Sequence, residues 1–185
     1  MQTAPIMNLI GHLDALLNPA AFDDYGPNGL QVPGNDAIGT VVTGVSASVE
    51  LFEQAAAHGA DLVLVHHGLF WGETGPVDAQ LKRRLKLLFE HDMALAAYHL
   101  PLDAHPELGN NALLARAMGA TELEPFADHR GQPIGFLATL QTGLAGQFGR
   151  RQVNGHWRAL LCCVQCREVC TAPSGRAQVK MPKRG

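Results

Sequence analysis

Two adjacent histidines, His66 and His67, follow an aliphatic run and precede a glycine in the stretch VLVHHGLFW (63–71). A second polar group, His99 and Asp103, lies in YHLPLDAHPELGNN (98–111). Neutral imidazoles bind zinc, iron, manganese and nickel, and a carboxylate can bridge two ions. Taken alone, a histidine pair is more often a surface or core feature than a ligand pair. The second cluster of His and Asp favours a centre for divalent metal ions, provided that the fold joins the two groups.

The elements around these residues predict such a fold. Apolar residues recur at helical spacing over four segments, 6–17, 49–59, 77–91 and 110–120. Runs of aliphatic and β-branched residues predict four strands, 38–48, 61–67, 93–99 and 133–140. The alternation predicts an α/β fold, a mostly parallel sheet with flanking helices. Because adjacent parallel strands present their carboxyl ends at one edge of the sheet, we expect the histidines and Asp103 to meet there.

The spacing of the pair suggests how ions would be held. Neighbours in a strand point to opposite sides, so His66 and His67 are expected to serve two ions, with Asp103 between them. Two-metal sites hold ions roughly 3.5–4 Å apart and activate water at neutral pH. Gly68 is expected to let the backbone turn. For His99 three roles remain open: metal ligand, catalytic proton shuttle, or a histidine satisfied in the core.

Charge and cysteine divide the chain near residue 150. Residues 1–149 contain six Lys and Arg against sixteen Asp and Glu, whereas residues 150–185 contain eight basic residues and one acid. All four cysteines also lie in the second part, at Cys162, Cys163, Cys166 and Cys170. We therefore predict an α/β metal-binding domain over 1–149 and an atypical basic, cysteine-containing tail over 150–185. The cysteine spacing does not match a zinc or iron–sulfur framework.

Several other classes of protein are not expected. No apolar run approaches the ~20 residues that cross a bilayer, which argues against a membrane protein. The N-terminal stretch MQTAPIMNLIGHLDALL lacks a basic start and is typical of a helix rather than a signal peptide, so we expect a cytoplasmic protein. The basic tail lacks the interleaved aromatic residues of a nucleic-acid surface, and no nucleic-acid partner is expected.

Three stretches together carry a resemblance to a known family. They are DDYGPNGLQVPG (23–34), GADLVLVHHGLFWG (59–72) and YHLPLDAHPELGNNALLA (98–115). Over about residues 6–140 the sequence resembles the Nif-three-like dinuclear-metal-centre hexameric proteins, the GTP cyclohydrolase 1 type 2 homologues. The resemblance implies a Nif-three-like fold, a homohexameric ring, and two divalent ions per subunit.

The resemblance also implies roles for particular residues. The metal ligands of the family match His66, His67 and Asp103, and His99 matches a family histidine beside the site. The segment 28–32, NGLQV, matches a glycine-containing loop, which is either a turn held by Gly29 or a substrate contact. The family name implies opening of the imidazole ring of GTP by a metal-activated water, and a nucleotide or other small molecule as substrate. The metal is expected to be Zn, Fe, Mn or Ni.

The resemblance stops before the end of the chain. Family members carry a closing segment with a further histidine and, shortly after it, a glutamate, and we find no such segment after GQFGRR (146–151). A shifted reading frame or a truncated gene product would explain the tail. We therefore expect weaker metal binding and poorer assembly than in a complete member. The leading hypothesis is a metal-dependent hydrolase; its rivals are a non-catalytic metal-binding oligomeric scaffold and a non-functional truncated product.

Overall fold

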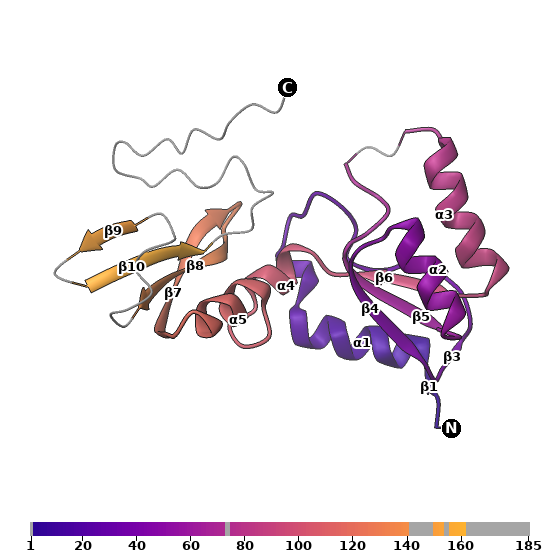
Figure 1. Cartoon of the computed structure of the whole chain (residues 1–185), viewed down its shortest axis with the longest axis horizontal. Helices are drawn as coiled ribbons and strands as arrows, with labels where there is room; N and C mark the ends of the chain where they lie inside the picture. Colours follow the sequence, from indigo (N-terminus) through magenta and orange to yellow (C-terminus); the bar gives the residue numbers. More distant parts are fainter. Residues whose placement is uncertain (1, 73–74, 141–149, 154–155, 162–185) are drawn as a thin grey trace. The chain divides into compact units, whose positions relative to one another are not determined.

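The computed structural model describes residues 2–72, 75–140, 150–153 and 156–161 (Figure 1). The chain divides into two compact units, Met1–Leu102 and Asp103–Gly185. The domain boundary predicted near residue 150 rests on composition and stays a prediction. Among the described residues, no helix combines the length and apolarity that crossing a bilayer would need.

A four-stranded sheet forms the centre of the first unit. Its strand order is β2 (Gly29–Val32), β6 (Ala94–Ala97), β5 (Leu62–His67) and β4 (Val41–Ser46). The β4–β5 and β5–β6 pairs are parallel and β2 is antiparallel to β6, which confirms the predicted mostly parallel sheet. The segment before β4, for which no strand was predicted, contains β2 and a short 3-10 helix, Pro19–Ala21. Two further short strands, β1 (Ala4–Pro5) and β3 (Ala37–Ile38), pair with each other.

The three helices of this unit begin and end close to the predicted positions. They are α1 (Ile6–Leu17), α2 (Val49–Ala57) and α3 (Ala79–Glu90). The Ser48 hydroxyl accepts a hydrogen bond from the Leu51 amide at 3.2 Å, so Ser48 caps α2. Gly59 follows α2 with a φ of 62°, a left-handed conformation that suits the end of a helix.

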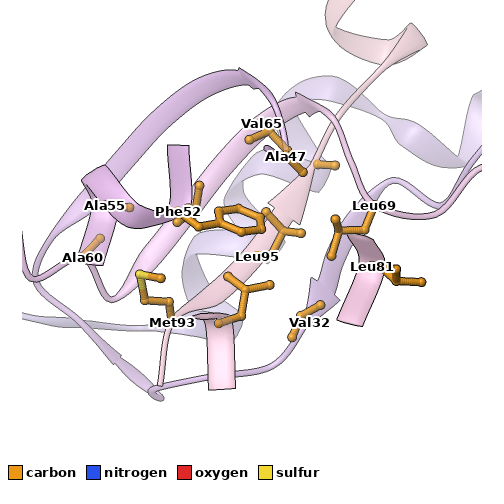
Figure 2. Packing of buried hydrophobic residues seen from close by; sticks show 13 residues of the cluster. Val32, Ala47, Phe52, Ala55, Ala60, Val65, Leu69, Leu81, Met93 and Leu95 are labelled. Atoms are coloured by element: carbon orange, nitrogen blue, oxygen red, sulfur yellow. The ribbon is translucent and has the colours of Figure 1, made fainter. Parts of the chain in front are cut away.

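The strands β5 and β6 are largely buried on both faces of the sheet, and alternate residues of β5 pack in opposite directions. Val63 and Val65 join a cluster with Phe52 of α2, whose ring lies among apolar neighbours in Figure 2. Leu62 packs in a second cluster with Ile6 and Ile10 of α1. The helices α2 and α3 therefore cover one face of the sheet and α1 covers the other (Figure 1).

The second unit is built on an antiparallel sheet. Its strand order is β7 (Ala120–His129), β8 (Gln132–Leu140), β10 (His156–Leu161) and β9 (Arg150–Val153). The helix α5 (Asn110–Ala117) precedes this sheet, and the short helix α4 (Leu100–Ala104) joins the two units.

One predicted strand belongs to a different sheet from the one expected. The segment 133–140 is a strand, β8, but it lies in the antiparallel sheet and not beside the parallel strands. Between β7 and β8, Arg130 and Gly131 have φ values of 51° and 91°. Positive φ at both central residues is typical of a two-residue hairpin turn, which connects only antiparallel neighbours. The strands β7, β9 and β10 have no counterpart among the sequence predictions.

Candidate metal centre

The carboxyl ends of the parallel strands meet at one edge of the first unit, as predicted. Ser46 at the end of β4 stands opposite His67 at the end of β5. Beyond the strands, the Ala47 amide donates to the His67 carbonyl at 2.8 Å, and the Tyr98 amide donates to the Val65 carbonyl at 3.1 Å. These bonds hold Ser46, His67 and the start of the segment after β6 at the same edge.

Three of the predicted residues form a histidine cluster at this edge, composed of His66, His67 and His99. The ring centroids lie 4.5 Å apart for His66 and His67, 4.9 Å for His66 and His99, and 5.6 Å for His67 and His99. Each ring offers a nitrogen, and the three nitrogens lie within 4.8 Å of one another, so the cluster can hold a metal ion. The expectation that the rings of His66 and His67 diverge is wrong. Since β5 ends at His67, both side chains can bend over the end of the strand toward the same space.

Hydrogen bonds orient the ring of His66. Its Nδ1 lies 3.0 Å from the Tyr98 carbonyl oxygen. A carbonyl oxygen only accepts, so Nδ1 carries the proton and Nε2 carries the lone pair of the neutral ring. Tyr98 is itself anchored, because its hydroxyl donates to Asp14 Oδ1 at 2.7 Å. Burial, together with the neighbouring Asp14 carboxylate, raises the pKa of Tyr98, which therefore remains a donor at neutral pH.

His67 is held from the neighbouring strand. Its Nδ1 lies 3.0 Å from the Ser46 hydroxyl oxygen, at the end of β4. As with His66, this hydrogen bond engages Nδ1, which favours Nε2 as the atom that would bind a metal.

A buried aspartate that the sequence analysis did not assign holds His99. Asp24 Oδ1 lies 2.7 Å from His99 Nδ1, and the side chains are only 2% and 7% exposed. Asp24 Oδ2 accepts from the Leu100 amide at 2.8 Å and from Asn28 Nδ2 at 2.9 Å. Asn28 Oδ1 in turn accepts from the His99 amide at 2.7 Å. The loop before β2 therefore holds both the ring and the backbone of His99.

The same contacts keep Asp24 ionised. Burial is the largest influence and by itself would raise the pKa of Asp24. The hydrogen bonds from His99, Asn28 and the Leu100 amide outweigh it and hold the pKa of Asp24 below its ordinary value. Because an ionised carboxylate only accepts hydrogen bonds, Nδ1 of His99 is the donor.

The other nitrogen of His99 fits a metal ligand. Its Nε2 is buried and has no hydrogen-bond partner among the residues that the structure describes. A histidine satisfied in a core would have partners for both nitrogens. Metal-binding histidines commonly donate their second ring N–H to a carboxylate or a backbone carbonyl, as His99 and His66 do here. The donor set therefore suits a divalent ion that accepts nitrogen ligands.

A small open pocket lies beside the histidine cluster. Its walls come from the loop before β2 and the segment after β5, together with the ends of β5 and β6: Gly26, Pro27, Gln31, His66, Gly68, Phe70, Trp71, Ala97 and His99. Its volume, counting the space that is open to solvent, is about 170 Å³. This pocket lies beside the three ring nitrogens and therefore has room for a small group next to a bound metal ion.

The segment NGLQV, expected as a loop, forms β2 from Gly29 onward and lines this pocket with Gln31. Gly29 has a φ of 93°, which agrees with the predicted turn. Gln31 joins two walls of the pocket, since its Nε2 donates to the Pro27 carbonyl and its Oε1 accepts from the Leu69 amide, both at 2.8 Å. A Cβ on Gly68 would collide with the end of the Gln31 side chain, so Gly68 leaves room for the Gln31 amide group in its present position. The turn expected at Gly68 stays a prediction.

Asp103, the fourth predicted site residue, belongs to the second unit. It lies in α4, is 1% exposed, and accepts a hydrogen bond from Asn110 Nδ2 at 3.1 Å. Its approach to the histidines stays a prediction.

The four cysteines of the tail, whose spacing does not match a zinc or iron–sulfur framework, lie outside the described residues.

The first unit is therefore an α/β unit with a candidate metal-binding histidine cluster at the carboxyl edge of a mostly parallel sheet. The family model described as Duf34/NIF3 (NGG1p interacting factor 3) matches residues 4–170. The chain belongs to this family. The match continues past residue 150, into the segment that its composition sets apart.

Individual relatives agree with the family assignment. A GTP cyclohydrolase 1 type 2 homolog of Deinococcus radiodurans is 43% identical over 139 residues, which are 75% of this chain and 53% of that protein. The homolog of Escherichia coli K12 is 55% identical over 113 residues, 59% of this chain and 46% of that protein. The crystal structure of TTHA1606 from Thermus thermophilus matches with a TM-score of 0.72 and 34% identity, covering 85% of this chain and 69% of that one. This chain spans about half the length of the curated relatives it matches.

Proposed function

We propose that the chain is a metal-dependent hydrolase of small molecules, with His66, His67 and Asp103 as ligands of two divalent ions. The histidine cluster carries the proposal, because three ring nitrogens lie within 4.8 Å at the carboxyl edge of the sheet. The names of the curated relatives, GTP cyclohydrolase 1 type 2 homologs, support opening of the imidazole ring of a guanine nucleotide as the reaction. Asp103 follows His99 by four residues, which supports its inclusion in the ligand set.

The residues of the chain would contribute binding and proton handling. When bound, a divalent ion supplies Lewis acidity and lowers the pKa of a coordinated water toward neutrality. His66 and His67 would present Nε2 to the ion while Tyr98 and Ser46 hold their Nδ1 atoms. Two roles fit His99, ligand and proton carrier, and either would use Nε2, because Nδ1 is engaged by Asp24. The pocket beside the cluster would admit the reacting part of the substrate, and the rest would bind elsewhere.

Metal content and turnover, measured on the purified full chain, test the proposal. We expect bound Zn, Fe, Mn or Ni by elemental analysis, and loss of the guanine ultraviolet absorbance when GTP is added. His66→Ala should lose both metal and turnover, whereas Asp103→Asn should lower the metal content and turnover while leaving the fold intact. Metal retained without turnover of any nucleotide would contradict the hydrolase and favour the scaffold.

Two further expectations from the family resemblance accompany this proposal. Self-association as a homohexamer would appear as six chain masses in light scattering, and a monomer or an aggregate would contradict it. A cytoplasmic location would appear by fractionation of cells that express the chain.

A further inference from the structure

The contacts of Asp24 point to a function for a residue outside the proposed ligand set. The side chain of Asp24 is nearly fully buried, and its two oxygens accept hydrogen bonds from different donors. Oδ2 accepts from two donors, the Leu100 amide and Asn28 Nδ2, so that position must be an acceptor. Oδ1 accepts from the ring of His99 at 2.7 Å and from the amide of Tyr25, the next residue in the chain, also at 2.7 Å. The hydrogen bond from Tyr25 is exposed.

We propose that Asp24 is a positioning residue that holds His99 in its Nδ1–H tautomer, so that Nε2 becomes the third nitrogen ligand of an ion bound with His66 and His67. This inference rests on the proposed metal centre, and it goes beyond that centre in adding His99 to the ligands and Asp24 behind it. All four residues belong to the first unit, so this three-histidine site would be complete within residues 1–102.

The hydrogen bonds of Asp24 predict a specific effect of replacing this residue with asparagine. In Asp24→Asn we expect the amide oxygen to replace Oδ2, because the two part-buried donors there require an acceptor, whereas the exposed Tyr25 amide at the other oxygen can bind water instead. The amide NH₂ then replaces Oδ1 and donates to His99 Nδ1. The ring must carry its proton on Nε2 instead, and Nε2 loses the lone pair that binds the metal. The same exchange in another buried carboxylate–histidine pair is known to select the wrong tautomer.

Alanine distinguishes this role from a merely structural one. Asp24→Ala removes the carboxylate that favours the Nδ1–H tautomer, and His99 can then adopt either tautomer. A bound ion can still select the Nδ1–H form. A structural role would predict the reverse order, because alanine leaves a cavity and donors without an acceptor whereas asparagine nearly preserves the shape.

The experiment measures the affinity of the full chain for Zn²⁺, by competition with a chromophoric chelator. Relative to the unmodified chain, we expect Asp24→Asn to lose about 10–100-fold, as typical for a partner of a metal ligand, and to approach the loss in His99→Ala. Asp24→Ala should lose less than Asp24→Asn. Asp61→Asn is the matched control. Asp61 also accepts several hydrogen bonds in this unit, from Gly39, Thr40 and Asn35, and none of these donors is a histidine.

A second measurement needs no metal. The ¹⁵N chemical shifts of the His99 ring in the metal-free protein should show a protonated Nδ1 in the unmodified chain and a protonated Nε2 in Asp24→Asn. Unchanged Zn²⁺ affinity in Asp24→Asn, a greater loss in Asp24→Ala, or a protonated Nε2 in the unmodified chain would overturn the role of Asp24. Each of those results would leave the proposed metal centre standing. Failure of the unmodified chain to bind Zn²⁺ would overturn both.

Discussion

Two carboxylates of the first unit hold segments that are far apart in the sequence. Asp24 links the loop before β2 to the segment after β6. Asp61 accepts from the amides of Gly39 and Thr40, both at 2.8 Å, and from Asn35 Nδ2 at 3.3 Å, and so joins the start of β5 to the turn between β3 and β4. Each carboxylate must be ionised to accept all of its donors, which makes both contributions sensitive to acid.

The acid sensitivity can be tested at Asp61. The backbone hydrogen bonds from Gly39 and Thr40 hold the pKa of Asp61 below its ordinary value. A carboxyl group whose pKa is lower in the folded state contributes stability above its unfolded pKa of about 3.9, and loses it as the pH falls through the folded value. In Asp61→Asn we expect a lower free energy of unfolding at neutral pH, by about 1–3 kcal/mol.

The variant should also lose less stability than the unmodified chain on going from about pH 5 to about pH 3. Urea denaturation at a series of pH values measures both effects. Equal dependence on pH in the two proteins would show that Asp61 is not held as its contacts indicate.

At the scale of elements, two glycines of the first unit differ in the space around them: Gly11 lies in a helix and Gly34 in a loop. Gly11 is exposed in the middle of α1, and an added Cβ would contact nothing within 4 Å. Gly34, between β2 and β3, passes so close to β6 that a Cβ would collide with the backbone of Met93 and Ala94. Gly11 can therefore be replaced by a larger residue, whereas Gly34 allows its segment to pack against the start of β6.

The same substitution should consequently have opposite effects at the two positions. Gly11→Ala should raise the free energy of unfolding by about 0.8–1 kcal/mol, because alanine is the better helix former. Gly34→Ala should lower it by about 1–3 kcal/mol, because backbone cannot move aside as a flexible side chain can. Chemical denaturation of both variants measures the difference. Undiminished stability of Gly34→Ala would contradict the packing described for Gly34, and a loss in Gly11→Ala would contradict the open space described for Gly11.

At the scale of the whole molecule, the two units differ in what they contribute to a metal centre. His66, His67, His99 and Asp24 all lie in the first unit, and Asp103 lies in the second. A ligand that binds only the folded state stabilises that state in proportion to the logarithm of its concentration. Metal added to the chain should therefore stabilise the unit that contains the histidines.

Zinc addition tests this expectation. At a free concentration about 100 times the dissociation constant, Zn²⁺ should raise the free energy of unfolding of the first unit by about 2.7 kcal/mol. Trp71 is a suitable reporter, because its ring centroid lies 5.9 Å from that of His67, and a Trp157→Phe background would isolate its fluorescence. A chelator should reverse the gain and His66→Ala should abolish it. An equal gain in His66→Ala would locate the zinc elsewhere.

Local patterns in the sequence were sufficient for the helices and the parallel strands of the first unit. Periodicity predicted α1, α2, α3, β5 and β6 within a few residues, because apolar spacing records which face of an element is buried. The parallel order then placed His66, His67 and His99 at one edge, because crossover connections have one hand. In the second unit, β7 was missed because its acidic residues and Pro125 obscure the alternation expected of a strand.

What the sequence by itself determined is the family, the parallel sheet and the edge at which the histidines lie. Only the tertiary structure decided that the rings of His66 and His67 converge, that β8 joins a separate antiparallel sheet, and that Asp24 is the partner of His99. The physical reason is range: helix and strand patterns repeat every few residues, whereas Asp24 and His99 are separated by 75 positions. Their hydrogen bond depends on the path of the loop before β2, which side-chain contacts across the folded unit determine and no local spacing encodes.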